Sequence, residues 1–126
     1  MRDHRKLRAF QLADELALAV YRDTQRFPGD ERFGLTSQMR RAAVSIASNI
    51  VEGCARATEA DYLRFLDMSN ASARELEYQI GLAARLGFFG DASTAPDCVR
   101  LVGETNRTLA ALLRSLRHPR RQKPEA

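Results

Sequence analysis

Apolar residues recur at helical spacing in four successive stretches of the chain. The spacing predicts helices over about 7–25, 35–54 and 59–86, and a fourth that starts within 94–97 and ends before Pro119. The connections between these stretches are short, which favours antiparallel neighbours. The sequence therefore predicts an all-α fold, an antiparallel up-down-up-down four-helix bundle that forms a single domain over the 126 residues.

Local signals mark the ends of these helices. Thr58 precedes a first turn with two acidic residues, so we expect it to be the N-cap of the third helix. Phe88 and Phe89 follow that helix, and we expect them to plug this end of the bundle. In an up-down bundle the second helix ends at the pole where the first begins and the fourth ends. We call this end the basal pole.

The second and third helices carry apolar residues outside the stripe that is expected to face the core. A monomer that left both strips exposed would have an unusually apolar surface. The pattern therefore predicts a homo-oligomer. The candidate subunit-interface residues are Val44, Ala47, Val51, Leu63, Tyr78 and Leu82.

The formal net charge of +4 comes entirely from the C-terminal quarter of the chain, because residues 1–93 are neutral in sum and residues 94–126 are basic. Three arginines at seven-residue intervals share the side of the fourth helix opposite its leucines. The basic N-terminal segment 1–8, which we expect to be frayed, and the polar tail 117–126 should meet at the basal pole. Such charge density is what phosphate binding requires, although a solvated helix face is the alternative interpretation. The candidate nucleic-acid-binding residues are Arg100, Arg107, Arg114, Arg117, Arg120, Arg121, Lys123, Arg2, Arg5, Lys6, Arg8 and Arg56.

The inventory of reactive residues argues against an enzyme. His4 and His118 are the only histidines and lie in terminal segments, so no histidine can support a nucleophile or a carboxylate-bridged metal site. The glycines are scattered, which excludes a phosphate-cradling loop, and we expect no cofactor or metal. Cys54 and Cys98 are far apart, and we expect free buried thiols.

The sequence indicates no membrane association. No run approaches the roughly 18 apolar residues of a membrane span, and the N-terminal residues lack the apolar core of a signal peptide. We therefore expect a cytoplasmic protein that does not interact with a membrane.

Charged residues on the second and third helices predict a buried polar network. Arg41, Glu52 and Glu75 are its expected members, and salt bridges among them would fix helix register or subunit contacts. Direct ligand binding is the alternative for these residues. Arg40, beside the second apolar strip, could equally face a partner subunit.

Four segments within residues 7–88 carry a resemblance to a known family: FP-x-x-E-x-FGL, Q-x-RRAA-x-SI, N-I-x-EG and S-x-x-EL. The chain resembles the bacterial four-helix bundle proteins encoded by intervening sequences of 23S rRNA genes. The resemblance implies a homopentamer without enzymatic activity, distantly like the accessory protein of diversity-generating retroelements, which contacts a reverse transcriptase and nucleic acid. The motif residues present in this chain are Gln38, Arg40, Arg41, Asn49, Glu52, Gly53 and Glu75.

Two classes of function remain on this basis. One is a non-catalytic oligomer that associates with RNA or DNA through phosphate contacts at its basic end. The other is a protein-interaction scaffold that binds another protein and no nucleic acid. Only the first predicts binding that falls steeply with salt concentration.

Overall fold

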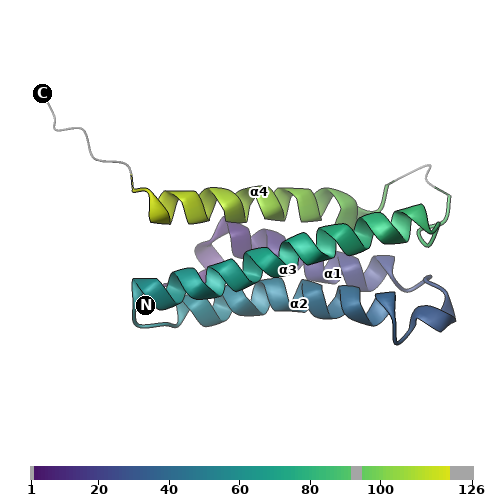
Figure 1. Cartoon of the computed structure of the whole chain (residues 1–126), viewed down its shortest axis with the longest axis horizontal. Helices are drawn as coiled ribbons and strands as arrows, with labels where there is room; N and C mark the ends of the chain where they lie inside the picture. Colours follow the sequence, from purple (N-terminus) through teal and green to yellow (C-terminus); the bar gives the residue numbers. More distant parts are fainter. Residues whose placement is uncertain (1, 92–94, 120–126) are drawn as a thin grey trace, which may run out of the picture.

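The computed structural model describes residues 2–91 and 95–119, and its regular elements are all helical (Figure 1). This confirms the predicted all-α class and four helices, and their ends lie close to the predicted ones. The helices are α1 (Arg8–Asp23), α2 (Leu35–Cys54), α3 (Glu59–Arg85) and α4 (Asp97–Arg117), with short 3-10 turns at η1 (His4–Lys6) and η2 (Gly29–Glu31).

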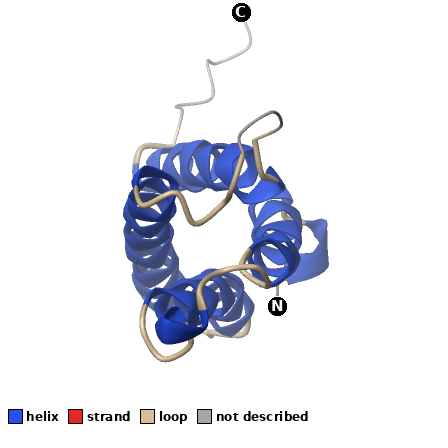
Figure 2. Ribbon diagram, turned by 90° about the vertical axis from the view of Figure 1, so that its right-hand side faces the viewer, coloured by secondary structure: helices blue, strands red, loops and turns tan. Residues whose placement is uncertain are grey.

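The four helices alternate in direction and surround one core. Each packs against two neighbours, α1 and α3 both lying against α2 and α4, and the end-on view shows the four helices around a common centre (Figure 2). The α2–α3 connection lies at the end of the bundle where the chain begins and α4 ends (Figure 1). The basal pole therefore gathers the N-terminal segment from residue 2, the end of α2 and the end of α4, as the sequence predicted; residues 120–126 of the tail lie outside the described residues. The largest fully buried side chains include Leu12, Leu16, Met39, Ile46, Ile50, Leu66, Leu76 and Leu109.

Side chains satisfy backbone groups at the starts of three helices. Thr58 Oγ1 accepts a hydrogen bond from the Asp61 N–H at 3.1 Å, which confirms Thr58 as the N-cap of α3. The Glu31 carboxylate accepts from the Leu35 N–H at 2.8 Å at the start of α2. The cap of α4 comes from another helix, because Asp23 at the end of α1 accepts from the Cys98 N–H at 3.0 Å. These contacts use backbone donors that a helix leaves without intrahelical partners.

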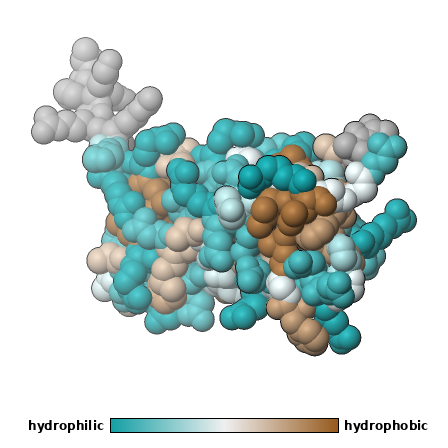
Figure 3. All heavy atoms as spheres, turned by 45° about the vertical axis from the view of Figure 1, so that its right-hand side comes forward, coloured by the Kyte–Doolittle hydropathy of each residue, from teal (hydrophilic) through white to brown (hydrophobic). Residues whose placement is uncertain are grey.

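Aromatic rings close the pole opposite the basal one, which we call the distal pole. The Phe27 ring lies 5.4 Å from that of Phe88 and 5.1 Å from that of Phe89, centroid to centroid. Both distances are typical of favourable aromatic pairs, so the predicted plug is confirmed. Figure 3 shows apolar side chains gathered towards this pole on one face of the molecule.

Both cysteines are buried free thiols, as predicted. Cys54 ends α2 at the basal pole and Cys98 begins α4 at the distal pole, so the length of the bundle separates them. Burial raises the pKa of both thiols, which disfavours the reactive thiolate. None of the described helices combines the length and the apolarity that crossing a bilayer requires.

Candidate functional site

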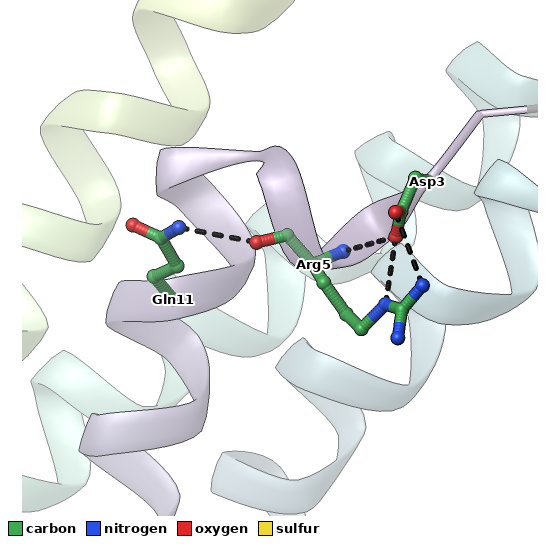
Figure 4. Close-up of polar contacts among 3 residues, drawn as sticks. All are labelled: Asp3, Arg5 and Gln11. Carbon is green, nitrogen blue, oxygen red and sulfur yellow. Dashed lines mark hydrogen bonds and ion pairs between the residues drawn. The ribbon is translucent and has the colours of Figure 1, made fainter.

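The N-terminal segment is folded onto the bundle, so the prediction of a frayed segment 1–8 is wrong for its described residues. Asp3 caps η1 by accepting from the Arg5 backbone N–H at 3.1 Å, and its carboxylate also receives the Arg5 guanidinium at 3.0 and 3.2 Å (Figure 4). These hydrogen bonds lower the pKa of the Asp3 carboxyl. Gln11 Nε2 then donates to the Arg5 carbonyl oxygen at 3.1 Å and ties the turn to α1.

Most of the candidate cations that the structure describes at the basal pole have acidic partners. Arg2 pairs with Glu59 and places its guanidinium 3.8 Å from the centre of the Tyr62 ring. Arg117 pairs with Asp67, and this hydrogen bond raises the pKa of the guanidinium. Two further pairs form within single segments, Arg5 with Asp3 and Arg56 with Glu52. The pole is rich in arginine as predicted, but these four charges are largely balanced.

The outer face of α4 is less balanced. Arg100, Arg107 and Arg114 are all exposed, which confirms that they lie on the side away from the core. Arg100 pairs with Glu104 at 3.2 Å. Arg107 and Arg114 form no ion pair with any residue that the structure describes, and the same is true of exposed Lys6 and Arg8 near the basal end. The remaining tail candidates lie outside the described residues: Arg120, Arg121 and Lys123.

The prediction of a buried network among Arg41, Glu52 and Glu75 is wrong, because all three side chains are exposed. Glu52 pairs instead with Arg56, which follows the C-terminal end of α2, and Glu75 accepts a hydrogen bond from Gln79. These residues lie beside the contact between α2 and α3, where none of the other described helices covers their side chains.

Serines make polar contacts between α2 and α3. Ser69 Oγ is fully buried and donates to the Ile46 carbonyl oxygen at 2.8 Å. The hydroxyls of Ser45 and Ser72 lie 3.0 Å apart, and Asn49 Nδ2 donates to Ser45 Oγ at 3.0 Å. The sequence did not predict this network, although its signal was present as small hydroxyl residues beside the apolar stripes of both helices.

Arg40 serves the contact between α1 and α2. Its guanidinium donates to Thr24 Oγ1 at 2.9 Å and to the Tyr21 carbonyl oxygen at 3.3 Å, and it lies 4.7 Å from the centre of the Tyr21 ring. Arg40 therefore joins α1 to α2 within one chain, a role that was not predicted when Arg40 was considered as a contact to a partner subunit.

Gly53 lets α2 and α3 approach closely at the basal end. A Cβ atom at this position would lie 2.9 Å from Phe65 Cβ and 3.4 Å from the Tyr62 carbonyl oxygen. Separations under 3 Å between such atoms are repulsive, so the family-like glycine is required by packing here.

A polar groove of about 450 Å³ lies between α2 and α3, further from the basal pole. Arg41 and Glu75 are exposed within it, and the half-buried Ser45–Ser72 pair bridges the two helices. We call this feature the α2–α3 groove; its lining residues are Gln38, Arg41, Ala42, Ser45, Ser72 and Glu75.

The candidate interface residues divide into two groups. Val44, Val51 and Tyr78 are exposed, at 43, 36 and 63 % respectively. Ala47, Leu63 and Leu82 are half-buried and pack against the core of their own chain. The first group keeps apolar surface available for another subunit, and the interface stays a prediction.

Comparison with known proteins agrees with the fold and the motif segments. A family model described as 23S rRNA-intervening sequence protein matches residues 5–110. The chain belongs to this family. Its fold is similar to that of a Bacteroides thetaiotaomicron protein of unknown function from the S23 ribosomal protein family, with a TM-score of 0.70 and 20 % sequence identity over 84 % of this chain and 95 % of that one. None of the curated proteins matches the chain.

Proposed function

We propose that this member of the 23S rRNA-intervening sequence protein family is a non-catalytic homo-oligomer that binds the phosphate backbone of RNA. The observation that carries the proposal is the outer face of α4, where exposed Arg107 and Arg114 have no acidic partner among the described residues. Cations without acidic partners are free to displace counterions from phosphates. The family description names 23S rRNA, which supports RNA as the nucleic acid of this proposal.

Fewer basic residues are available for phosphate contacts than the distribution of charge along the sequence suggested. Arg2, Arg5, Arg56 and Arg117 would have to leave acidic partners in order to bind phosphate. Arg107 and Arg114 need no such exchange, and neither do Lys6 and Arg8. In an oligomer this set is repeated in every subunit, which raises the local charge density.

A salt titration with oligouridylate tests the proposal. The double variant Arg107→Glu/Arg114→Glu should bind at least about 10-fold more weakly near 100 mM salt, and the salt dependence should flatten by about 0.7 log units for each phosphate that the protein no longer neutralises. Arg32→Glu/Arg85→Glu is the matched control, because both arginines are exposed near the distal pole. Equal weakening in both variants would indicate a net-charge effect and contradict an α4 interface.

A protein-interaction scaffold is the second candidate. The acidic partners of the basal arginines favour it, as do the exposed Val44, Val51 and Tyr78. Under this alternative the intact protein shows no salt-sensitive RNA binding at all. Light scattering tests the assembly that both candidates share, and the expected mass is about five times the 14.2 kDa chain.

A further inference from the structure

The residues that line the α2–α3 groove come from the motif segments, but most of them are not part of the hydrophobic core. All six lining residues come from Q-x-RRAA-x-SI and S-x-x-EL. Ala42 is the only one that is buried, and the other five are exposed or half-buried. Packing in the core therefore accounts for Ala42. It does not account for the other five residues, which lie outside the hydrophobic core.

The register of the two helices places Arg41 and Glu75 on opposite walls. Ser45 and Ser72 mark the level at which the antiparallel helices face each other, 3.0 Å apart. Arg41 lies four residues before Ser45, and Glu75 lies three residues after Ser72, so each is displaced by about 5 Å in the same direction along the bundle. The two charges form no ion pair with each other or with any other described residue.

A buried amide orients the Glu75 carboxylate. Gln79 is 4 % exposed, and its Nε2 donates to Glu75 Oε1 at 3.2 Å. The Oε1 atom of the same Gln79 side-chain amide is buried without a partner among the described residues. Leaving such an acceptor unsatisfied costs free energy, and arrangements of this kind need an explanation other than stability. The amide holds an exposed carboxylate in place at the expense of its own hydrogen bonding.

The charges of the groove restrict its ligand. A simple anion would meet Glu75, and a simple cation would meet Arg41. A neutral ligand that presents donors to one wall and acceptors to the other fits both, and a volume of about 450 Å³ is in the range of small-molecule sites.

Guanine has this pattern among the RNA bases. Its N1–H and N2–H groups are adjacent donors that match the two oxygens of a carboxylate, and its O6 and N7 are adjacent acceptors that match a guanidinium. Adenine, cytosine and uracil each place an acceptor beside a donor on the Watson–Crick edge, so one carboxylate oxygen would face a lone pair. Unpaired RNA bases are commonly recognised on these edges.

We propose that the α2–α3 groove binds an unpaired guanine base, with Glu75 accepting from N1–H and N2–H and Arg41 donating to O6 and N7. The Ser45 and Ser72 hydroxyls lie at the basal end of this site. The inference rests on the proposed RNA association and adds to it a base preference that phosphate contacts cannot supply.

Isothermal titration calorimetry on the intact protein tests the site with three nucleotides. Guanosine 5′-monophosphate should bind at least about 10-fold more tightly than inosine 5′-monophosphate, which lacks the N2 amino group, and adenosine 5′-monophosphate should bind more weakly still. All three carry the same phosphate, so equal binding would show phosphate recognition alone and overturn the proposal. Absence of guanosine monophosphate binding at millimolar concentration would also overturn it.

Variants then locate the site. Glu75→Gln should weaken guanosine monophosphate binding at least about 10-fold and remove the preference over inosine monophosphate. Glu77→Gln on the same helix is the control for Glu75→Gln, because the Glu77 side chain is exposed and lies outside the groove. Unchanged guanosine monophosphate binding by a folded Glu75→Gln protein would contradict the placement of the guanine site in this groove. The comparison of the three nucleotides uses only the unmodified protein, so it tests guanine selectivity even if a variant does not fold.

The proposed phosphate-backbone interface on α4 and the proposed guanine site in the groove can be contradicted independently of each other. Oligouridylate contains no guanine, so Glu75→Gln should leave its binding unchanged, whereas Arg107→Glu/Arg114→Glu should leave guanosine monophosphate binding unchanged. A protein that binds guanosine monophosphate selectively but no oligouridylate would contradict the backbone interface and support the groove. Salt-sensitive oligouridylate binding without guanine selectivity would overturn the groove alone.

Discussion

The same two helices, α2 and α3, form a closed contact at the basal end and an open groove further along. At the closed end Gly53 brings the helices together, since a Cβ atom there would lie only 2.9 Å from Phe65 Cβ, and Glu52 pairs with Arg56 at 2.6 Å. In the groove, serine hydroxyls bridge the helices and Arg41 and Glu75 remain apart.

This difference indicates which charged residues pair with each other within the fold and which remain unpaired. Glu52 lies in the last turn of α2 and Arg56 just beyond it, so the local course of the chain brings them together without any contact from another helix. Arg41 and Glu75 belong to different helices, and tertiary packing sets their separation. Charges of the first kind balance each other wherever the helix forms, while those of the second kind stay available to a ligand.

Breaking the closed end should have the largest effect. Gly53→Ala should lower the free energy of unfolding by about 2 kcal/mol, because the new methyl group would press against Phe65 and overpacking in a tight contact costs about 1–3 kcal/mol. Urea denaturation measures the change. The matched control is Gly81→Ala on α3, which has open space around the site and should raise the free energy of unfolding by up to about 1 kcal/mol.

Equal stabilisation by both substitutions would contradict the closed contact. It would mean that α3 moves away from α2 at no cost, so that helix propensity alone determines the outcome. The sign of the difference between the two variants is therefore the informative quantity.

Alkaline pH should weaken the closed end next. Burial raises the pKa of the Tyr62 hydroxyl and of the Cys54 thiol above their ordinary values of 10.0 and 9.0. The folded protein keeps these protons to higher pH than the unfolded chain does, so their stabilising effect is complete below about pH 9 and is lost as pH rises. Each group can contribute a slope of at most about 1.4 kcal/mol per pH unit.

Tyr62→Phe should reduce the alkaline slope of the free energy of unfolding measured between pH 8 and about pH 11. Tyr78→Phe on the same helix is the control, because Tyr78 is 63 % exposed. A slope that falls equally in both variants would show that burial at the closed end is not its cause.

The fold followed from the sequence because its signals are local or periodic. The apolar stripe of 35–54 predicted α2 with the same bounds as in the structure, and the acidic first turn after Thr58 marked the start of α3. The cap of α4 was not predicted, because Asp23 reaches Cys98 from the end of another helix. Contacts between distant residues depend on helix register, which periodicity does not specify.

The candidate sites were predicted from the sequence less completely than the fold was, for the same reason. Spacing correctly placed Arg100, Arg107 and Arg114 on the outer side of α4. It could not show that Arg2 and Arg117 pair with Glu59 and Asp67, since these acids lie on α3. The motif residues Arg41 and Glu75 were recognised, but their position in one groove depends on the relative register of α2 and α3.

Removing the groove charges should have the smallest effect on stability. Arg41→Gln and Glu75→Gln should each change the free energy of unfolding by less than about 0.5 kcal/mol, because both side chains are exposed and neither forms an ion pair among the described residues. Arg56→Ala at the closed end should cost more, about 0.5–1 kcal/mol, since it removes the Glu52 pair and the stacking on the Phe65 ring at 4.5 Å.

A double-mutant cycle on Arg41 and Glu75 makes the distinction quantitative. If the two residues serve a ligand, the cycle should give a coupling energy close to zero in the free protein, because their charges do not meet across the groove. A coupling comparable to that of Glu52 and Arg56 would show that the groove closes in solution through an Arg41–Glu75 ion pair. The charges would then stabilise the helix contact, and the open and closed regions of α2 and α3 would differ only in how tightly they pack.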